Sequence, residues 1–465
     1  MTFRAGLLAA RGHIVFLLGL AAAFGIIFAL ETWDAPHGAA VAGPVVEASA
    51  DIPEPAHAPL DATEMRAAEI AWAYFARNIR PETGLADAVA NFPATTMWDT
   101  GSFLLAAVAA ERLGILPRAE FDTIVARALE TLASLQLYAD LLPNKSYDTT
   151  TLAMTDYANL PVDGGIGWSA LDIGRLLISF DAIRRHHPRH AEAVQEVLNA
   201  WQIDAAVRDG VLIGAQPSED GGLVLLQEGR VGYERYAAKG FALFGYDVHA
   251  AIRLDDTLRW VEVSGVDIPT DARGDDFGGH VFTVSDPFIM DGVEFGWDTV
   301  TRELAWRVYR AQENRYRETG ILTAVNEDHI DRAPHFIYST VLGDGVPWAV
   351  LTDNAGDASG FRILSTKAAL GWHALYQTDY TTRLEAAVAD QASPEGWATG
   401  PFEEIAELNT ARAANTNGVI LTAMHYRAFG PLLHPIREGR ELDARVEQQQ
   451  TAPLRAGSRP EARVE

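Results

Sequence analysis

Carboxyl groups that stand beside arginine, glycine or aromatic residues are the clearest candidates for chemistry in this chain. Glu228 is followed two positions later by Arg230, which could bind a substrate or fix the carboxylate, with a salt bridge at the rim of the fold as the alternative. Glu294 lies between small and aromatic residues in an expected loop, where apolar neighbours raise the pKa of a carboxyl group. Cleavage of a glycosidic bond needs one protonated and one ionised carboxyl group. We therefore predict Glu228 and Glu294 as a catalytic pair.

Two aspartates that closely follow a tryptophan are expected at the beginning of helices. Asp172 is predicted to join the catalytic group and Asp99 to bind a sugar hydroxyl, although either could simply cap its helix. Glu327 competes with Glu294 for the role of the acid, because crowded like charges, here with Asp328, keep one proton bound. Asp99, Glu327 and Asp328 are therefore predicted to contact the substrate.

Tryptophan is abundant, with 11 residues in the chain, and several lie near the acidic loops. A flat ring with a polar edge stacks well on the face of a sugar, although most such rings are more often packed in a core. The residues predicted to bind substrate beside the acids are Trp98, Trp168, Arg230, Trp297 and Trp397.

Composition excludes several classes of site. The chain has no cysteine, so thiolate nucleophiles, thiolate metal sites and disulfides are absent. His186, His187 and His190 stand around a proline with poor ligand geometry, and the acidic loop 353–359 lacks the spacing of a calcium-binding hand. No phosphate loop, dinucleotide fingerprint or nucleophile elbow is present. We predict neither a metal ion nor a cofactor.

The formal net charge of −26 and the sequence pI of about 4.8 restrict the partners of this chain. Nucleic acids are bound through clustered lysine and arginine, so we expect no nucleic-acid partner. Polyanionic glycans would be repelled as well. A neutral oligosaccharide or polysaccharide is the expected partner.

An uncharged segment at residues 14–30 follows Arg4 and Arg11 and precedes acidic residues. Its length and flanking charges predict one transmembrane helix that places the following chain outside the inner membrane. A signal peptide cut near residues 40–42 is the alternative, which would leave a periplasmic protein. The predicted organisation is an anchor or signal at 1–34, an Ala/Pro-rich linker at 35–62, one domain at 63–435 and a disordered tail at 436–465.

Apolar residues at helical spacing predict about ten helices in the domain, with few strands. The expected helices cover 64–80, 100–113, 117–135, 170–187, 190–201, 233–247, 299–316, 367–376, 381–391 and 416–429. Only 210–230 and 279–285 alternate as strands do. Because the spacing of the helices follows no short repeat, we predict an all-α ring of helical hairpins, a toroid with a small β rim, that gathers the acidic loops at one end.

Several separate strings of the chain resemble, in order, a bacterial envelope family known as domain of unknown function 3131. The resemblance covers about residues 65–432 and rests on the strings at 96–102, 142–144, 167–172, 320–328 and 415–417. The family name implies no activity.

A second resemblance carries chemical meaning. Glu228-Gly229-Arg230 followed by Ala238-Lys239-Gly240 is similar to paired motifs of the glucoamylase-like clan, and Asp172, Gly174 and Leu176 match its helix start, although Ile173 and Arg175 depart from it. That clan, which includes β-1,2-glucanases and transglycosylase domains of cyclic β-1,2-glucan synthases, has an (α/α)6 barrel. The resemblance implies a glycoside hydrolase or transglycosylase for a neutral bacterial β-glucan, including β-1,2-glucan. A non-catalytic glycan-binding or scaffold protein of an envelope polysaccharide system is the alternative.

Overall fold

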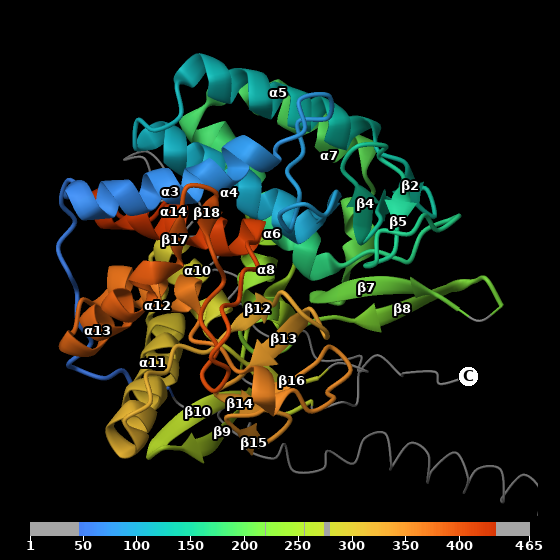
Figure 1. Cartoon of the computed structure of the whole chain (residues 1–465). Helices are drawn as coiled ribbons and strands as arrows, with labels where there is room; N and C mark the ends of the chain where they lie inside the picture. The colour runs from blue at the N-terminus through green and yellow to red at the C-terminus, as the bar shows by residue number, and fades with distance from the viewer. Residues whose placement is uncertain (1–45, 219, 255, 274–279, 434–465) are drawn as a thin grey trace, which may run out of the picture. The chain divides into compact units, whose positions relative to one another are not determined.

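The computed structural model describes residues 46–218, 220–254, 256–273 and 280–433 (Figure 1). All of them belong to one unit that begins at Val46. The predicted membrane segment at 1–34 and the predicted tail at 436–465 lie outside the described residues. Among those that are described, no helix combines the length and the apolar character needed to cross a membrane.

All ten predicted helices are present in the described residues, and two further helices were not predicted. The ten are α3 (Ala62–Asn78), α4 (Met97–Arg112), α5 (Arg118–Ser134), α6 (Ala170–His186), α7 (Ala191–Ala200), α8 (Tyr233–Leu243), α11 (Thr299–Thr319), α12 (Thr366–Tyr376), α13 (Asp379–Val388) and α14 (Ala414–Phe429). The additional helices are α9 (His249–Ile252) and α10 (Asp286–Phe295).

Helix α10 corrects the expectation that Glu294 lies in a loop. Pro287 occupies the first turn, where its missing N–H costs nothing, and Gly296 ends the helix in the left-handed conformation with φ 81°. Both signals are visible in the sequence. The glycine and aromatic residues between them are what suggested a loop.

Six helices pack against one another in a closed cycle. Helix α4 contacts α6, α6 contacts α8, and the cycle continues through α10, α12 and α14 back to α4. These ring helices are buried on nearly all sides, as residues 103–110 of α4 illustrate, because a helix that is apolar all around needs neighbours on every face. Helices α3, α5, α7, α11 and α13 are amphipathic and pack on the ring from outside. Figure 1 shows α3 and α14 side by side, which joins the two ends of the described chain.

Glycine permits the closest approach in the ring, between α6 and α8. A Cβ atom on Gly240 would lie 2.1 Å from the carbonyl oxygen of Gly174, and one on Gly174 would lie 2.5 Å from that of Ala237. Larger residues at either position would force the two helices apart. The Gly174 of the resemblance therefore has a packing role.

Short antiparallel sheets decorate the ring. The predicted strand segment 210–230 is confirmed as the hairpin of β7 (Val211–Pro217) and β8 (Leu223–Gln227), which extends away from the helices in Figure 1. Segment 279–285 contributes only β11 (Phe282–Thr283). Further sheets of the described residues were not predicted. They include the hairpin of β9 (Leu258–Val263) and β10 (Val266–Asp271), and the sheet of β12 (Glu327–His329), β13 (Phe336–Ser339) and β16 (Val350–Leu351).

The second half of the predicted linker is docked on the domain. Ile52 and Leu60 pack against the main hydrophobic core. The backbone N–H of Ser49 donates to the buried carboxylate of Glu303 at 2.8 Å, and Arg302 pairs with Glu54 at 2.6 Å. The segment 46–60 thus acts as a strap across the first turn of α11.

Replacing Glu303 with glutamine is expected to lower the free energy of unfolding by about 2 kcal/mol, because the strap loses a charged acceptor that is also paired with Arg307. Chemical denaturation measures this change. Glu130→Gln, at an exposed pair with Arg127 on the outer helix α5, is the control and should change stability by less than about 1 kcal/mol. Equal effects of the two substitutions would contradict a structural role for the strap.

Candidate functional site

The first turns of the six ring helices meet at one end of the ring, called here the amino end. Each carries a polar side chain toward this region, and the set consists of Asp99, Asp172, Tyr233, Asp286, Lys367 and Asn415. Helix amino termini supply positive potential, and loops from several elements converge there. The predicted gathering of acids at one end of a ring is therefore observed for several, but not all, of the predicted residues.

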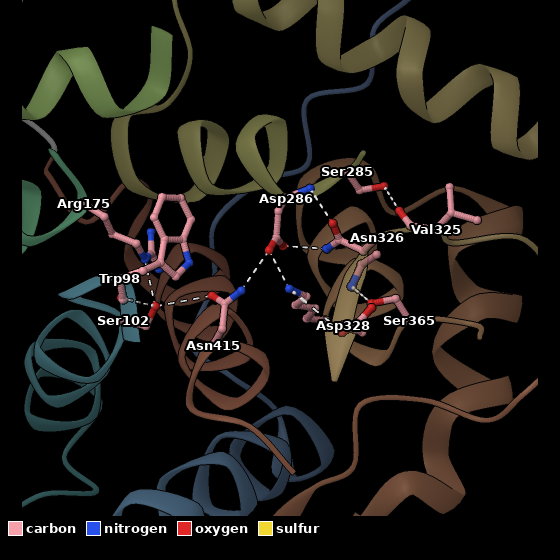
Figure 2. A network of polar contacts seen from close by, with 12 residues as sticks. Trp98, Ser102, Arg175, Ser285, Asp286, Val325, Asn326, Asp328, Ser365 and Asn415 are labelled. Atoms are coloured by element: carbon pink, nitrogen blue, oxygen red, sulfur yellow. Dashed lines mark hydrogen bonds and ion pairs between the residues drawn. The ribbon is translucent and has the colours of Figure 1, made fainter. Parts of the chain in front are cut away.

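The carboxylate of Asp286 joins three of these helices at a single point. It has no exposed surface and accepts hydrogen bonds from Lys367 at 2.5 Å, from Asn415 at 2.9 Å and from the side chain of Asn326 at 2.6 Å. Figure 2 shows Asn326 and Asn415 reaching it from opposite sides. A buried charge needs this degree of pairing, so the contact fixes α10, α12, α14 and the segment before β12 relative to one another.

Glu228 and Asp172 lie together at the amino terminus of α6. The hydroxyl of Ser169 is 2.7 Å from Glu228 Oε1 and 3.0 Å from Asp172 Oδ1, and the N–H of Ala170 donates to Glu228 Oε2 at 2.6 Å. Ser169 is also the N-cap, since its oxygen accepts from the N–H of Asp172. Asp172 therefore does not cap the helix, and its half-buried carboxyl group is open to chemistry.

The same arrangement occurs one helix earlier in the ring. Thr96 caps α4 by accepting from the N–H of Asp99 and donates its own hydroxyl to Asp99 Oδ2 at 2.8 Å. Neither aspartate is a cap, which removes the alternative left open by the sequence. Burial raises the pKa of Asp99 to about 6, against the opposing effects of Thr96 and the charges of Lys367 and Arg175.

Burial and mutual repulsion favour the protonated forms of Asp172 and Glu228. The pKa of Asp172 is raised to about 8, first by burial and then by the charge of Glu228, with Asp99 adding to the effect. The pKa of Glu228 is also raised by burial, against the hydrogen bonds from Ser169 and Ala170. At neutral pH the neutral form of Asp172 is favoured, and a neutral carboxyl group can donate a proton.

A second acidic group comes from β12, where Glu327 and Asp328 point to opposite faces of the strand. Burial raises the pKa of Glu327 to about 7 and that of the buried Asp328 to about 8, although the ammonium of Lys367 lowers both. Glu327 is half-buried, pairs in register with Tyr338 and feels the charge of Asp99. It can therefore contact a substrate, whereas Asp328 is enclosed.

Aromatic rings border the acids. Trp98 lies 5.5 Å from the ring of Tyr233, and the guanidinium of Arg175 lies 5.0 Å above its indole. Tyr157 is 65% exposed as a residue. Desolvation of its hydroxyl, followed by the charges of Asp172 and Glu228, raises its pKa. An exposed ring next to half-buried carboxyl groups is suited to bind a sugar face.

Glu294 does not join Glu228. Its side chain has no exposed surface, Oε1 accepts from Arg175 at 3.2 Å, and Oε2 accepts from the hydroxyl of Tyr236 at 2.5 Å. Burial raises its pKa, but Arg175 and Tyr236 oppose that shift. With both oxygens bonded beneath the surface, Glu294 has no free face for a substrate. The apolar context read from the sequence is real, but it belongs to the core.

Two predicted tryptophans are also core residues. Trp168 is 1% exposed and donates its N–H to the carbonyl oxygen of Ile213, and Trp397 is 6% exposed and donates to that of Ala67. Neither ring has a face free for a sugar. Trp297 is half-buried and stacks on Tyr376 at 5.6 Å, so one of its faces is covered.

Arg230 is buried and holds its own loop. One of its NH groups donates to Gln227 Oε1 at 2.9 Å and to the carbonyl oxygen of Gly229 at 2.7 Å. Arg230 therefore holds the backbone of the loop that carries Glu228, whereas the sequence suggested that it binds a substrate or fixes the carboxylate.

Several residues of the amino end were not predicted. Asp286 and Lys367 are the buried pair, Ser169 connects two carboxyl groups, and Tyr157 supplies the exposed ring. Asn415 belongs to one of the strings that carry the family resemblance, but no role was predicted for it. In the described part of the chain, no group of three or more His, Asp or Glu side chains is arranged to hold a metal ion.

Replacing Glu294 with glutamine is expected to destabilise the fold by about 3–5 kcal/mol, because the buried guanidinium of Arg175 loses its counter-charge. The midpoint of urea denaturation measures this. Glu228→Gln, at a half-buried position, should cost much less. A stable Glu294→Gln protein would contradict the structural role given to Glu294 here.

Several solved structures of other proteins are similar to this fold. Similar solved structures are a proposed glucoamylase from Bacteroides fragilis (TM-score 0.63, 12% identity, 87% of this chain and 99% of that chain) and the endo-β-1,2-glucanase from Chitinophaga pinensis with sophorotriose and glucose (0.60, 10%, 84% and 98%). A third is the endo-β-1,2-glucanase from Talaromyces funiculosus with sophorose (0.56, 11%, 83% and 88%). At such identities the likeness is one of fold.

No curated protein matches the chain. Residues 66–430 match the family described as protein of unknown function (DUF3131), which confirms the resemblance drawn from the sequence. The chain belongs to this family.

Proposed function

We propose that this protein is a glycoside hydrolase or transglycosylase that acts on a neutral β-glucan at the amino end of an (α/α)6 barrel. The observation that carries the proposal is the row of half-buried carboxyl groups with raised pKa values, Asp172 and Glu228 on one side and Glu327 on the other. Exposed and half-buried aromatic rings flank this row.

Asp172 is the proposed proton donor. As the bond between the anomeric carbon and the bridging oxygen breaks, the Asp172 proton moves to that oxygen and the leaving sugar departs as an alcohol. Glu228, which shares the Ser169 hydroxyl with Asp172, keeps the proton on Asp172 through its negative charge. The catalytic role predicted for Glu228 is thus retained in an indirect form.

Glu327 is the proposed second carboxyl group. In its ionised form it either attacks the anomeric carbon or removes a proton from the water, or the acceptor hydroxyl, that attacks. The charge of Asp99 raises the pKa of both Asp172 and Glu327, so Asp99 interacts with both sides of the site. Asp99 and Trp98 are proposed to bind sugar hydroxyls and a sugar face.

The substrate class follows from charge and from the neighbours in fold. A site rich in carboxyl groups on a chain of net charge −26 repels acidic glycans. Two of the similar structures are named endo-β-1,2-glucanases, which supports β-1,2-glucan as the first substrate to test. An extracytoplasmic location, through the predicted segment at 1–34, is part of the proposal.

Asp172→Asn and Glu327→Gln are each expected to lower kcat about 10²–10⁴-fold, because each removes one half of the acid–base pair. The assay is release of oligosaccharides from a panel of neutral β-glucans. Glu313→Gln on the outer helix α11 makes the same chemical change at an ion pair away from the amino end and should keep full activity.

Full activity in both site variants would refute the assignment. If the unaltered protein binds β-glucan oligosaccharides but releases no product over long incubation, the protein is a glycan-binding component and the catalytic proposal fails.

The pH dependence tests the role of Glu228. A proton donor with a pKa of about 8 loses its proton as the pH rises through that value, so activity should fall on the alkaline side near pH 8. Because the charge of Glu228 raises the pKa of Asp172, Glu228→Gln should move this alkaline limb of kcat/KM to lower pH. If the alkaline limb does not shift, the charge of Glu228 does not act on Asp172, and the role proposed for Glu228 is wrong.

A further inference from the structure

The loop that carries Glu228 is held by a closed set of buried polar contacts that the proposed chemistry does not use. Gln227 Nε2 donates to the carbonyl oxygens of Glu228 and Gly229 at 2.8 and 3.2 Å, and to Glu234 Oε1 at 2.9 Å. Gly229 has φ 91°, and a Cβ atom there would lie 2.8 Å from that of Glu234. The positive φ of Gly229 and the close approach of Glu234 thus hold the backbone of the loop against the first turn of α8.

The other half of the set comes from the end of the β9–β10 hairpin. Arg273 pairs with Glu234 Oε2 at 2.7 Å and with both oxygens of Asp271, through Nε at 2.9 Å and NH2 at 2.6 Å. Asp271 Oδ2 in turn accepts the backbone N–H of Val231 at 2.9 Å. The contacts thus run from the loop through Glu234 and Arg273 to Asp271 and back to the loop.

Arg273 connects the two acids of this set, Glu234 and Asp271. The side chains of Glu234 and Asp271 are 4% and 0% exposed, so each depends on the guanidinium to balance its charge. Without Arg273 the two carboxylates would repel each other on either side of the loop, and the N–H of Val231 would lose a fixed acceptor.

We propose that Arg273 is a positioning residue that holds Glu228 against the amino terminus of α6. The inference rests on the proposed function for its effect on catalysis, because Glu228 acts there through Asp172. Its structural part, the ordering of loop 227–231 by the hairpin, stands on the contacts alone. A lysine in place of Arg273 keeps the charge but lacks the planar fork that reaches both acids.

The test compares Arg273→Met and Arg273→Lys with Arg315→Met in the full-length protein. Arg315 is the matched control, because it also forms a two-pronged ion pair, with Glu403 at 3.0 and 2.9 Å. Amide hydrogen exchange of residues 227–231 and steady-state kinetics on β-glucan are measured for each. Arg273→Met should speed exchange at the Val231 amide and lower kcat/KM about 10–100-fold, mainly through kcat. Arg273→Lys should fall between.

Arg315→Met should leave exchange at 227–231 and the alkaline limb of the pH profile unchanged, whereas Arg273→Met should move that limb to lower pH. Equal exchange at Val231 in Arg273→Met and Arg315→Met would overturn the inference, whatever the activity. If the unaltered protein cleaves no glucan, the proposed function fails, and the exchange experiment still decides the positioning role. If Arg273→Met does not fold, Arg273→Lys decides it by the same two readouts.

Discussion

The ion pair between Asp286 and Lys367, completed by the amides of Asn326 and Asn415, is the contact on which the rest of the site depends. A charge buried without a partner costs several kcal/mol, so α10, α12, α14 and the segment before β12 must meet at this point. Their meeting closes the ring and brings the amino termini of its helices together. The acids of the amino end are therefore placed by a contact that itself takes no proton and binds no sugar in the proposed chemistry.

The acids of the site outnumber the nearby cations, and this explains why the carboxyl groups differ in their pKa values and in their proposed roles. Burial raises the pKa values of Asp99, Asp172 and Glu327, and Lys367 opposes that shift for Asp99 and Glu327. Asp172 instead lies beside Glu228, whose charge adds to the effect of burial. The two sides of the site thus differ in their affinity for a proton, although both carry the same chemical group.

The sequence predicted the helices well because apolar residues recur at helical spacing, and the strings at 96–102 and 167–172 placed Asp99 and Asp172 at helix starts. It did not distinguish an apolar pocket from a core, so Glu294 and Trp168 were assigned to the site although both are buried and bonded. Asp286 and Lys367 lie 81 residues apart, and no local pattern marks them as a pair. The β9–β10 hairpin did carry a signal, since alternating residues flank Ser264-Gly265, and it was missed.

A crystal structure of the Asp172→Asn protein with a β-1,2-gluco-oligosaccharide tests the central claim most directly. The account predicts sugar rings at the amino end, with the glycosidic oxygen next to residue 172, an anomeric carbon facing Glu327 and a ring against Trp98 or Tyr157. An oligosaccharide bound with full occupancy on another face of the molecule, with the amino end empty, would contradict the account.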